Sequence, residues 1–211
     1  MDNRALLELI EKNVKQVISE QGTIKVGVSA RHVHLSRKDL DTLFGEGYEL
    51  TFLKPLMGDQ FAAKETVTIV SDSMRSMEGL RILGPVRKES QVEISRTDTF
   101  KLKNSPPVRP SGDLEGSAPI TIVGPKGAVF LDKGCIIANR HIHMTPSEAA
   151  KYNIRDNDYV DVELDTEKKT RYYGVQVRVA EDFNTEMHID TDDANAAGVK
   201  CGSRVRIIGK A

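Results

Sequence analysis

The first twenty residues carry apolar side chains at helical spacing. Leucine, isoleucine and valine recur every three or four positions, at Leu6, Leu7, Ile10, Val14, Val17 and Ile18. Charged residues fill many of the intervening positions, so the pattern predicts an amphipathic helix that ends near Gly22. We therefore treat residues 1–22 as an N-terminal helical segment, separate from the rest of the chain.

From Ile24 onward the pattern changes to short runs rich in β-branched residues. These runs are interrupted by glycine, proline, asparagine and aspartate, and they cover residues 24–28, 66–70, 91–95, 120–123, 135–138, 159–164, 173–179 and 204–208. Short strands at this density are typical of barrels and sandwiches. Residues 103–119 contain four prolines, which predicts an irregular connection instead of a helix.

The chain also contains an internal repeat. Residues 31–36 (RHVHLS) recur in closely similar form as residues 140–145 (RHIHMT), and each copy follows a β-branched strand. Each copy ends in a hydroxyl residue with an acidic residue three positions later, which predicts the start of a helix. A further parallel aligns residues 91–95 with 186–190 and places Glu93 opposite His188. The sequence therefore indicates two related halves.

All the histidines of the chain lie in these repeated segments. They are His32, His34, His141, His143 and His188. Alternate residues of a strand point to the same side, so each His-x-His pair aims two imidazoles at one point, about 6.5 Å apart at the backbone. Imidazole is a favoured zinc ligand, and a carboxylate such as Glu93 can complete a three-ligand site with an open position. The alternatives are exposed or hydrogen-bonded strand histidines and a solvated strand carboxylate, but the repetition favours metal binding.

Three arginines lie near these segments. Arg87 follows a Gly-Pro turn, where its planar guanidinium could bind an anion such as phosphate or remain a surface group. Arg31 and Arg140 directly precede the two histidine pairs. On a strand they point away from the histidines, which favours packing or ion pairs for both.

Composition narrows the chemistry further. The 30 lysines and arginines nearly balance 31 aspartates and glutamates. The net charge therefore gives no overall attraction to nucleic acid or to an anionic membrane. Two cysteines cannot form a disulfide framework, and Cys135 begins an apolar strand, which favours a buried, unreactive thiol. The acidic residues at 190, 192 and 193 fit either a helix N-terminus or acceptors for imidazole N–H groups.

Four segments together resemble the signature segments of the PduL-type phosphate propanoyltransferases. They are residues 31–35, 83–98, 140–144 and 186–192. The resemblance covers the chain from about Ile24 to its end. It implies an all-β-dominated fold of two β-barrels capped by short α-helices. One barrel would comprise residues 23–30 with 139–211, and the other residues 31–138.

The resemblance also implies an activity. The family transfers an acyl group between coenzyme A (CoA) and phosphate, so propanoyl-CoA or acetyl-CoA plus phosphate gives acyl phosphate plus CoA. The implied site residues are His32, His34 and Glu93 for one zinc ion, His141, His143 and His188 for a second, and Arg87 for phosphate. Phosphate held by the second zinc would attack the thioester directly, while the first zinc would receive the CoA thiolate. No acyl-enzyme is needed, and the CoA-contacting residues are not implied.

Partners and location follow from the same resemblance. Acyl-CoA, phosphate and acyl phosphate are the expected small-molecule partners, with no nucleic acid or membrane, and a homo-oligomer is expected. The sequence shows no secretory signal or spanning stretch, so a cytoplasmic protein is expected. Enzymes of bacterial microcompartments often carry an N-terminal helix as a packaging signal, so residues 1–20 are expected to bind shell proteins and direct the chain to the lumen. The alternative is a helix docked on the barrel or between subunits.

Two other functions remain open at this point. A binuclear zinc hydrolase acting on thioesters or phosphoesters would use the same ligands. A non-catalytic module, in which zinc only ties the halves together, is the second alternative, although structural zinc usually has four protein ligands.

Overall fold

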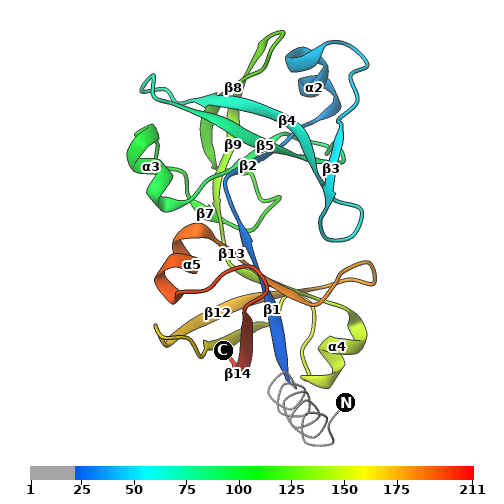
Figure 1. The fold of residues 1–211 in the computed structure, drawn as a ribbon, viewed down its shortest axis with the longest axis vertical. Coiled ribbons are helices and arrows are strands. Elements are labelled where there is room, and N and C mark those ends of the chain that lie inside the picture. Colours follow the sequence, from blue (N-terminus) through cyan, green and yellow to red (C-terminus); the bar gives the residue numbers. More distant parts are fainter. Residues whose placement is uncertain (1–21) are drawn as a thin grey trace, which may run out of the picture.

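Two β-barrels make up most of the computed structural model, which describes residues 22–211 (Figure 1). They lie one above the other along the long axis, and four short helices lie against them. The predicted all-β-dominated fold with two barrels is confirmed. The amphipathic helix predicted for the first twenty residues lies outside the described residues.

Barrel 1, the lower barrel in Figure 1, is a closed ring of six strands. Around the ring these are β1 (Thr23–Ser29), β13 (Glu186–Asp190), β10 (His141–Met144), β12 (Thr170–Val179), β11 (Tyr159–Leu164) and β14 (Arg204–Lys210). Side chains alternate along each strand between the apolar core of the barrel and its outer face. On β10, Ile142 and Met144 enter the apolar core, whereas His141 and His143 face outward.

Barrel 2 is closed by the strands of the middle of the chain. Its ring consists of β2 (His32–His34), β5 (Ser76–Gly84), β4 (Phe61–Val70), β8 (Ala118–Val123), β9 (Ala128–Ala138) and β6 (Gln91–Glu93), which pairs again with β2. Two short strands extend it: β3 (Phe52–Pro55) pairs with β4, and β7 (Val108–Arg109) pairs with β9. The proline-rich segment is irregular, as its composition predicts, apart from β7 and its last two residues, which begin β8.

The two rings have the same topology. Strand β10 is antiparallel to β13 and parallel to β12, as β2 is antiparallel to β6 and parallel to β5. The chain crosses between the barrels twice, because β1 of barrel 1 leads into β2 of barrel 2, and β9 of barrel 2 leads into β10 of barrel 1 (Figure 1). We therefore propose residues 23–30 with 139–211, and residues 31–138, as the two domains.

Each of four short strands leads directly into a helix. The helices are α2 (Arg37–Phe44), α3 (Arg96–Leu102), α4 (Pro146–Lys151) and α5 (Thr191–Ala197), and they follow β2, β6, β10 and β13 respectively. The side chains of Ser36, Ser95, Thr145 and Asp190 cap them by accepting a hydrogen bond from the backbone amide three residues later. The helix starts predicted after both histidine pairs are confirmed. The acidic cluster at 190–193 begins a helix, which decides between its two sequence interpretations.

The arginines before the two histidine pairs form equivalent ion pairs. Arg31 Nη2 lies 2.6 Å from Asp98 Oδ1, and Arg140 Nε lies 3.2 Å from Asp193 Oδ2. Both carboxylates belong to the first turn of a capping helix. The predicted ion-pair role is confirmed, and each pair ties a crossing segment to the helix of the barrel it enters or leaves.

Candidate active site

His32, His34 and Glu93 form a compact triad at the end of barrel 2 that faces barrel 1. Antiparallel pairing of β2 with β6 places His32 directly opposite Glu93. His32 Nε2 lies 3.2 Å from His34 Nε2 and 3.4 Å from Glu93 Oε2, and His34 Nε2 lies 3.9 Å from Glu93 Oε1. Two donors of one tetrahedral zinc ion, each about 2.0–2.2 Å from the metal, lie roughly 3.3–3.6 Å apart. The spacing therefore fits a shared cation.

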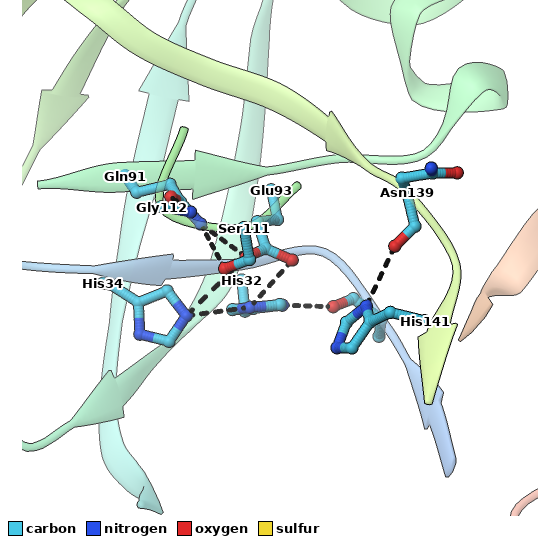
Figure 2. Close-up of polar contacts among 9 residues, drawn as sticks. His32, His34, Gln91, Glu93, Ser111, Gly112, Asn139 and His141 are labelled. Carbon is cyan, nitrogen blue, oxygen red and sulfur yellow. Dashed lines mark hydrogen bonds and ion pairs between the residues drawn. The ribbon is translucent and has the colours of Figure 1, made fainter. Parts of the chain in front are cut away.

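Other groups hold this triad in place (Figure 2). The carbonyl of Ala30 lies 2.8 Å from His32 Nδ1, which leaves Nε2 directed at the triad. Glu93 Oε1 accepts hydrogen bonds from the amide of Gln91 and from the hydroxyl of Ser111 at 2.8 Å. Such outer partners orient metal ligands. Ser111 comes from the proline-rich connection, so this irregular segment has a definite place beside the site.

His141, His143 and His188 form the equivalent group on barrel 1. Their ring centroids lie 4.6, 5.0 and 5.3 Å apart, and the carbonyl of Asn139 lies 2.9 Å from His141 Nδ1, as that of Ala30 does for His32. Within residues 22–211, His143 Nδ1 and His188 Nε2 are buried and make no hydrogen bond, and Glu186 Oε2 lies 3.4 Å from His188 Nε2. Buried polar atoms are normally paired, so these two nitrogens fit a ligand. Of the groups searched in that range, only the first triad brings three donor atoms within 4.8 Å of one another.

Burial keeps several imidazoles neutral. It lowers the pKa of His34 well below its usual value, with neighbouring His32 and Arg87 adding to the effect. Burial also lowers the pKa of His141, that of His143 to about 2 and that of His188 to about 4, and nearby histidines contribute to the last two shifts. A neutral imidazole is the form that binds metal, because its ring nitrogen has a free lone pair.

Arg87 enters the site from the segment after β5. Its backbone amide donates to the carbonyl of Leu35 at 2.8 Å, which fixes it beside the end of the histidine strand. Burial lowers the pKa of its guanidinium, opposed by Glu93 and reinforced by the positive charge of Arg178. None of the residues in the described range forms a hydrogen bond or ion pair with this guanidinium, so it remains available to an anion.

Both triads and Arg87 line one cleft between the barrels. The cleft has a volume of about 1380 Å³, and its wall includes all five histidines, Glu93 and Arg87. A smaller pocket of about 30 Å³ is lined by His32 and Glu93 of one triad and by His141 and His188 of the other. The sequence-predicted site residues, which come from distant parts of the chain, therefore face one shared space.

Comparison with known proteins assigns the chain to a family. A family model described as phosphate propanoyltransferase matches residues 25–200. The chain belongs to this family. The phosphate propanoyltransferases of Lachnoclostridium phytofermentans and Thermotoga maritima are each 54% identical to it, over 96% and 93% of this chain and 98% and 94% of their own lengths. That of Clostridioides difficile is 46% identical over 98% of both chains.

Membership of the phosphate propanoyltransferase family confirms the resemblance and the predicted enzyme class. The protein is an acyltransferase of the phosphate acyltransferase type. Among the residues the structure describes, no helix combines the length and the apolar character needed to cross a membrane.

Sequence reasoning missed several residues of this site. Gln91 and Ser111 support Glu93, while Arg178 and Glu186 line the cleft on barrel 1. The signal for Arg178 was its position between Val177 and Val179, two apolar residues of β12 that pack on the core, which marks an outward residue. Its partners could not be read from this pattern, because they lie on strands distant in sequence.

Cys135 is separate from this site. It lies in the core of barrel 2, is fully buried, and burial raises the pKa of its thiol to about 12. The predicted buried thiol is confirmed. Cys201, in contrast, is exposed and lines the cleft.

Proposed function

We propose that this acyltransferase is zinc-dependent and interconverts propanoyl-CoA or acetyl-CoA plus phosphate with acyl phosphate plus CoA. The main observation in support is the cleft that two histidine triads and Arg87 line together. The name of the relatives, phosphate propanoyltransferase, supports propanoyl as the transferred group and phosphate as its acceptor.

His32, His34 and Glu93 would hold one zinc ion, and His141, His143 and His188 a second. The donor spacing of the first triad supports this assignment, as do the buried nitrogens of the second triad that make no hydrogen bond within residues 22–211. When bound, the two ions would supply Lewis acidity that screens the charge of phosphate and stabilises the developing thiolate.

The residues of the chain itself bind and orient the substrates. Arg87 would bind phosphate through its planar guanidinium, whose charge has no partner within residues 22–211. One phosphate oxygen would then form the bond to the thioester carbonyl carbon, and the carbon–sulfur bond would break with release of CoA as the thiolate. Cys135, the thiol nearest in sequence to the second histidine pair, lies in the core of barrel 2, which argues against an acyl-enzyme on that residue.

Release of CoA from propanoyl-CoA, measured with and without phosphate, tests the proposed activity. We expect CoA release to depend on phosphate, with acyl phosphate as the second product. Equal CoA release without phosphate would favour the hydrolase. A zinc-loaded protein without thioester activity would favour the structural module.

We further propose that residues 1–20 direct the enzyme into the lumen of a bacterial microcompartment, that it is otherwise cytoplasmic, and that it forms a homo-oligomer. This proposal rests on the helical pattern of that segment and on the family. Deleting residues 1–20 should preserve acyl transfer and abolish co-localisation with shell proteins in cells. Loss of folding on deletion would favour a helix docked on the barrel or between subunits.

A further inference from the structure

A row of polar side chains runs across the cleft-facing side of barrel 1. Parallel pairing of β10 with β12 places His143 beside Arg178, and antiparallel pairing of β10 with β13 places His143 beside Glu186. On β12 the two neighbours of Arg178 are Val177, which is buried in the core, and Val179, which is partly buried and packs against the core. Arg178 therefore extends outward from the barrel, next to the second triad, and it lines the cleft.

Arg178 and Arg87 approach the cleft from opposite barrels. Arg178 belongs to barrel 1 and Arg87 to barrel 2, and both line the same space. The positive charge of Arg178 lowers the pKa of Arg87, so the two guanidiniums are within electrostatic range of each other. Throughout residues 22–211 the Arg178 guanidinium, like that of Arg87, makes no hydrogen bond or ion pair.

Two like charges that face one cleft repel each other, and an anion bound between them would offset this repulsion. A guanidinium offers several N–H donors in one plane, and it binds phosphate or carboxylate oxygens in pairs. Phosphate carries enough charge and enough oxygens to accept hydrogen bonds from two guanidiniums at once.

We propose that Arg178 is a second phosphate-binding residue, so that the reacting phosphate is held between one guanidinium from each barrel. This proposal rests on the proposed function and adds the residue that barrel 1 contributes to the anion site. Because the two arginines belong to different barrels, bound phosphate would also bridge them.

CoA also contains phosphate groups, and the position of Arg178 distinguishes between the two sources. Arg178 is the direct neighbour of His143 in the strand pairing, so it lies at the triad itself. The phosphates of CoA are separated from its sulfur by the whole pantetheine arm. When the thioester lies at the triads, the reacting phosphate is therefore the anion within reach of Arg178.

The test compares Arg178→Ala, Arg178→Lys and the control Arg171→Ala in the zinc-loaded enzyme. Arg171 lies on the same strand but pairs with Glu163 on the exposed face of barrel 1. Arg178→Ala should raise the KM for phosphate by about ten- to hundredfold, as expected for loss of a charge-assisted hydrogen bond, with little change in the KM for propanoyl-CoA. Arg178→Lys should recover part of this loss, and Arg171→Ala should match the wild type.

Equilibrium binding of inorganic phosphate, measured by calorimetry, provides the second readout. Phosphate binding that weakens in Arg178→Ala but not in Arg171→Ala supports the inference, even if the wild type proves to be a hydrolase. An unchanged KM and Kd for phosphate in Arg178→Ala, in an enzyme with phosphate-dependent CoA release, overturns it while the proposed function stands. If Arg178→Ala fails to fold, the same comparison of Arg178→Lys with the wild type decides.

A further experiment distinguishes the reacting phosphate from the phosphate groups of CoA. Propanoyl-pantetheine has the thioester but no phosphate group. If Arg178→Ala raises the KM for propanoyl-CoA, but not that for propanoyl-pantetheine or phosphate, then Arg178 binds the phosphates of CoA and the inference is wrong.

Discussion

The two triads occupy equivalent places in barrels of the same topology, yet their chemistry differs. Where barrel 2 has Glu93 opposite the first histidine of its pair, barrel 1 has His188. At the next equivalent position, opposite the second histidine, Gln91 of barrel 2 is replaced by Glu186 of barrel 1. The carboxylate therefore lies opposite the first histidine of the pair in barrel 2 and opposite the second in barrel 1.

The surroundings of the two carboxylates differ as well. Glu93 accepts hydrogen bonds from Gln91 and Ser111 and is held against its triad. The carboxyl group of Glu186 lies over Gly27, where an added Cβ would come within 3.1 Å of it, and its Oε2 is 3.4 Å from His188 Nε2. Gly27 thus leaves room for Glu186 beside the second triad.

This difference shows how a repeated framework can give two unlike sites. A carboxylate ligand offsets one unit of a dication's charge, whereas three neutral imidazoles leave that charge whole. The triad on barrel 1 would therefore leave more of the ion's charge for a multiply charged anion, with Glu186 beside His188 offsetting part of that charge. The arginines are also placed unequally, because Arg87 and Ala180 occupy equivalent positions beside Leu35 and Met144.

Removing one histidine pair at a time is expected to have the largest effect. The wild type should contain about two zinc ions per chain. His32→Ala with His34→Ala, or His141→Ala with His143→Ala, should lower this to about one and reduce activity by several orders of magnitude. Elemental analysis and phosphate-dependent CoA release measure both quantities. A fully active wild type with about one zinc, or full loading of either double variant, would refute two separate sites.

Replacing Arg87 should weaken phosphate use without loss of metal. Arg87→Ala is expected to cost roughly 2 to 4 kcal/mol of transition-state stabilisation if the contact is bidentate, and Arg87→Lys should recover only part of it. Steady-state kinetics in phosphate, with zinc content determined in parallel, tests this. Lys88→Ala, at the exposed neighbouring position, is the matched control. Unchanged phosphate kinetics in Arg87→Ala would make Arg87 a surface residue.

The equivalent ion pairs of the two halves should differ in strength. Asp98 is 3% exposed and Asp193 is 23% exposed, so losing Arg31 leaves the more deeply buried carboxylate without its partner. We expect Arg31→Ala to lower the free energy of unfolding by about 1–2 kcal/mol, and Arg140→Ala by about 1 kcal/mol. Urea denaturation measures both. The reverse order would show that the contact of Arg140 with the Tyr172 ring, 4.4 Å away, dominates.

The two cysteines should have the smallest effect on catalysis. Cys135→Ala and Cys201→Ala should retain activity within about tenfold, because only packing changes. In the folded protein at pH 8, iodoacetamide should modify the exposed Cys201 and not Cys135. An acyl group on Cys135, detected by mass spectrometry during turnover, would contradict direct transfer.

The raised pKa of Cys135 also makes the free energy of unfolding depend on pH. In the folded state burial raises the pKa of the Cys135 thiol to about 12, whereas a thiol in the unfolded chain loses its proton near pH 9.0. The folded state therefore binds more protons in this window, and the contribution of Cys135 to stability is lost as the pH rises from about 9 towards 12. A Cys135→Ala variant should lack this part of the pH dependence.

The parts of the site that repeat were the parts that sequence could predict. Both histidine pairs, the caps Ser36 and Thr145, and the ion-pair role of Arg31 and Arg140 follow from local patterns that occur twice. The fold class followed from the short strands together with the family resemblance.

Of the missed residues, Arg178 has no charged counterpart in the other half and Ser111 comes from an irregular segment, while Gln91 and Glu186 are counterparts that differ in type. Extending the pairing of β2 with β5 by one residue places Leu83 where barrel 1 has Arg178, so comparison of the halves gives no signal there. Ser111 lies in the proline-rich connection, whose path depends on the packing of barrel 2. Such positions are set by tertiary contacts, which a local pattern does not contain.

The two crossings of the chain between the barrels have a consequence for biosynthesis. Among residues 22–211, strand β1 pairs with β13 and β14, which follow every other strand of that range in the sequence, whereas barrel 2 has all six of its strands once Ala138 has emerged. Throughout most of translation β1 therefore has unpaired edges, and its pairings close over long sequence separations, which makes them slow to form. Folding of this enzyme is thus expected to proceed vectorially, with barrel 2 first and the N-terminal strand recruited at the end.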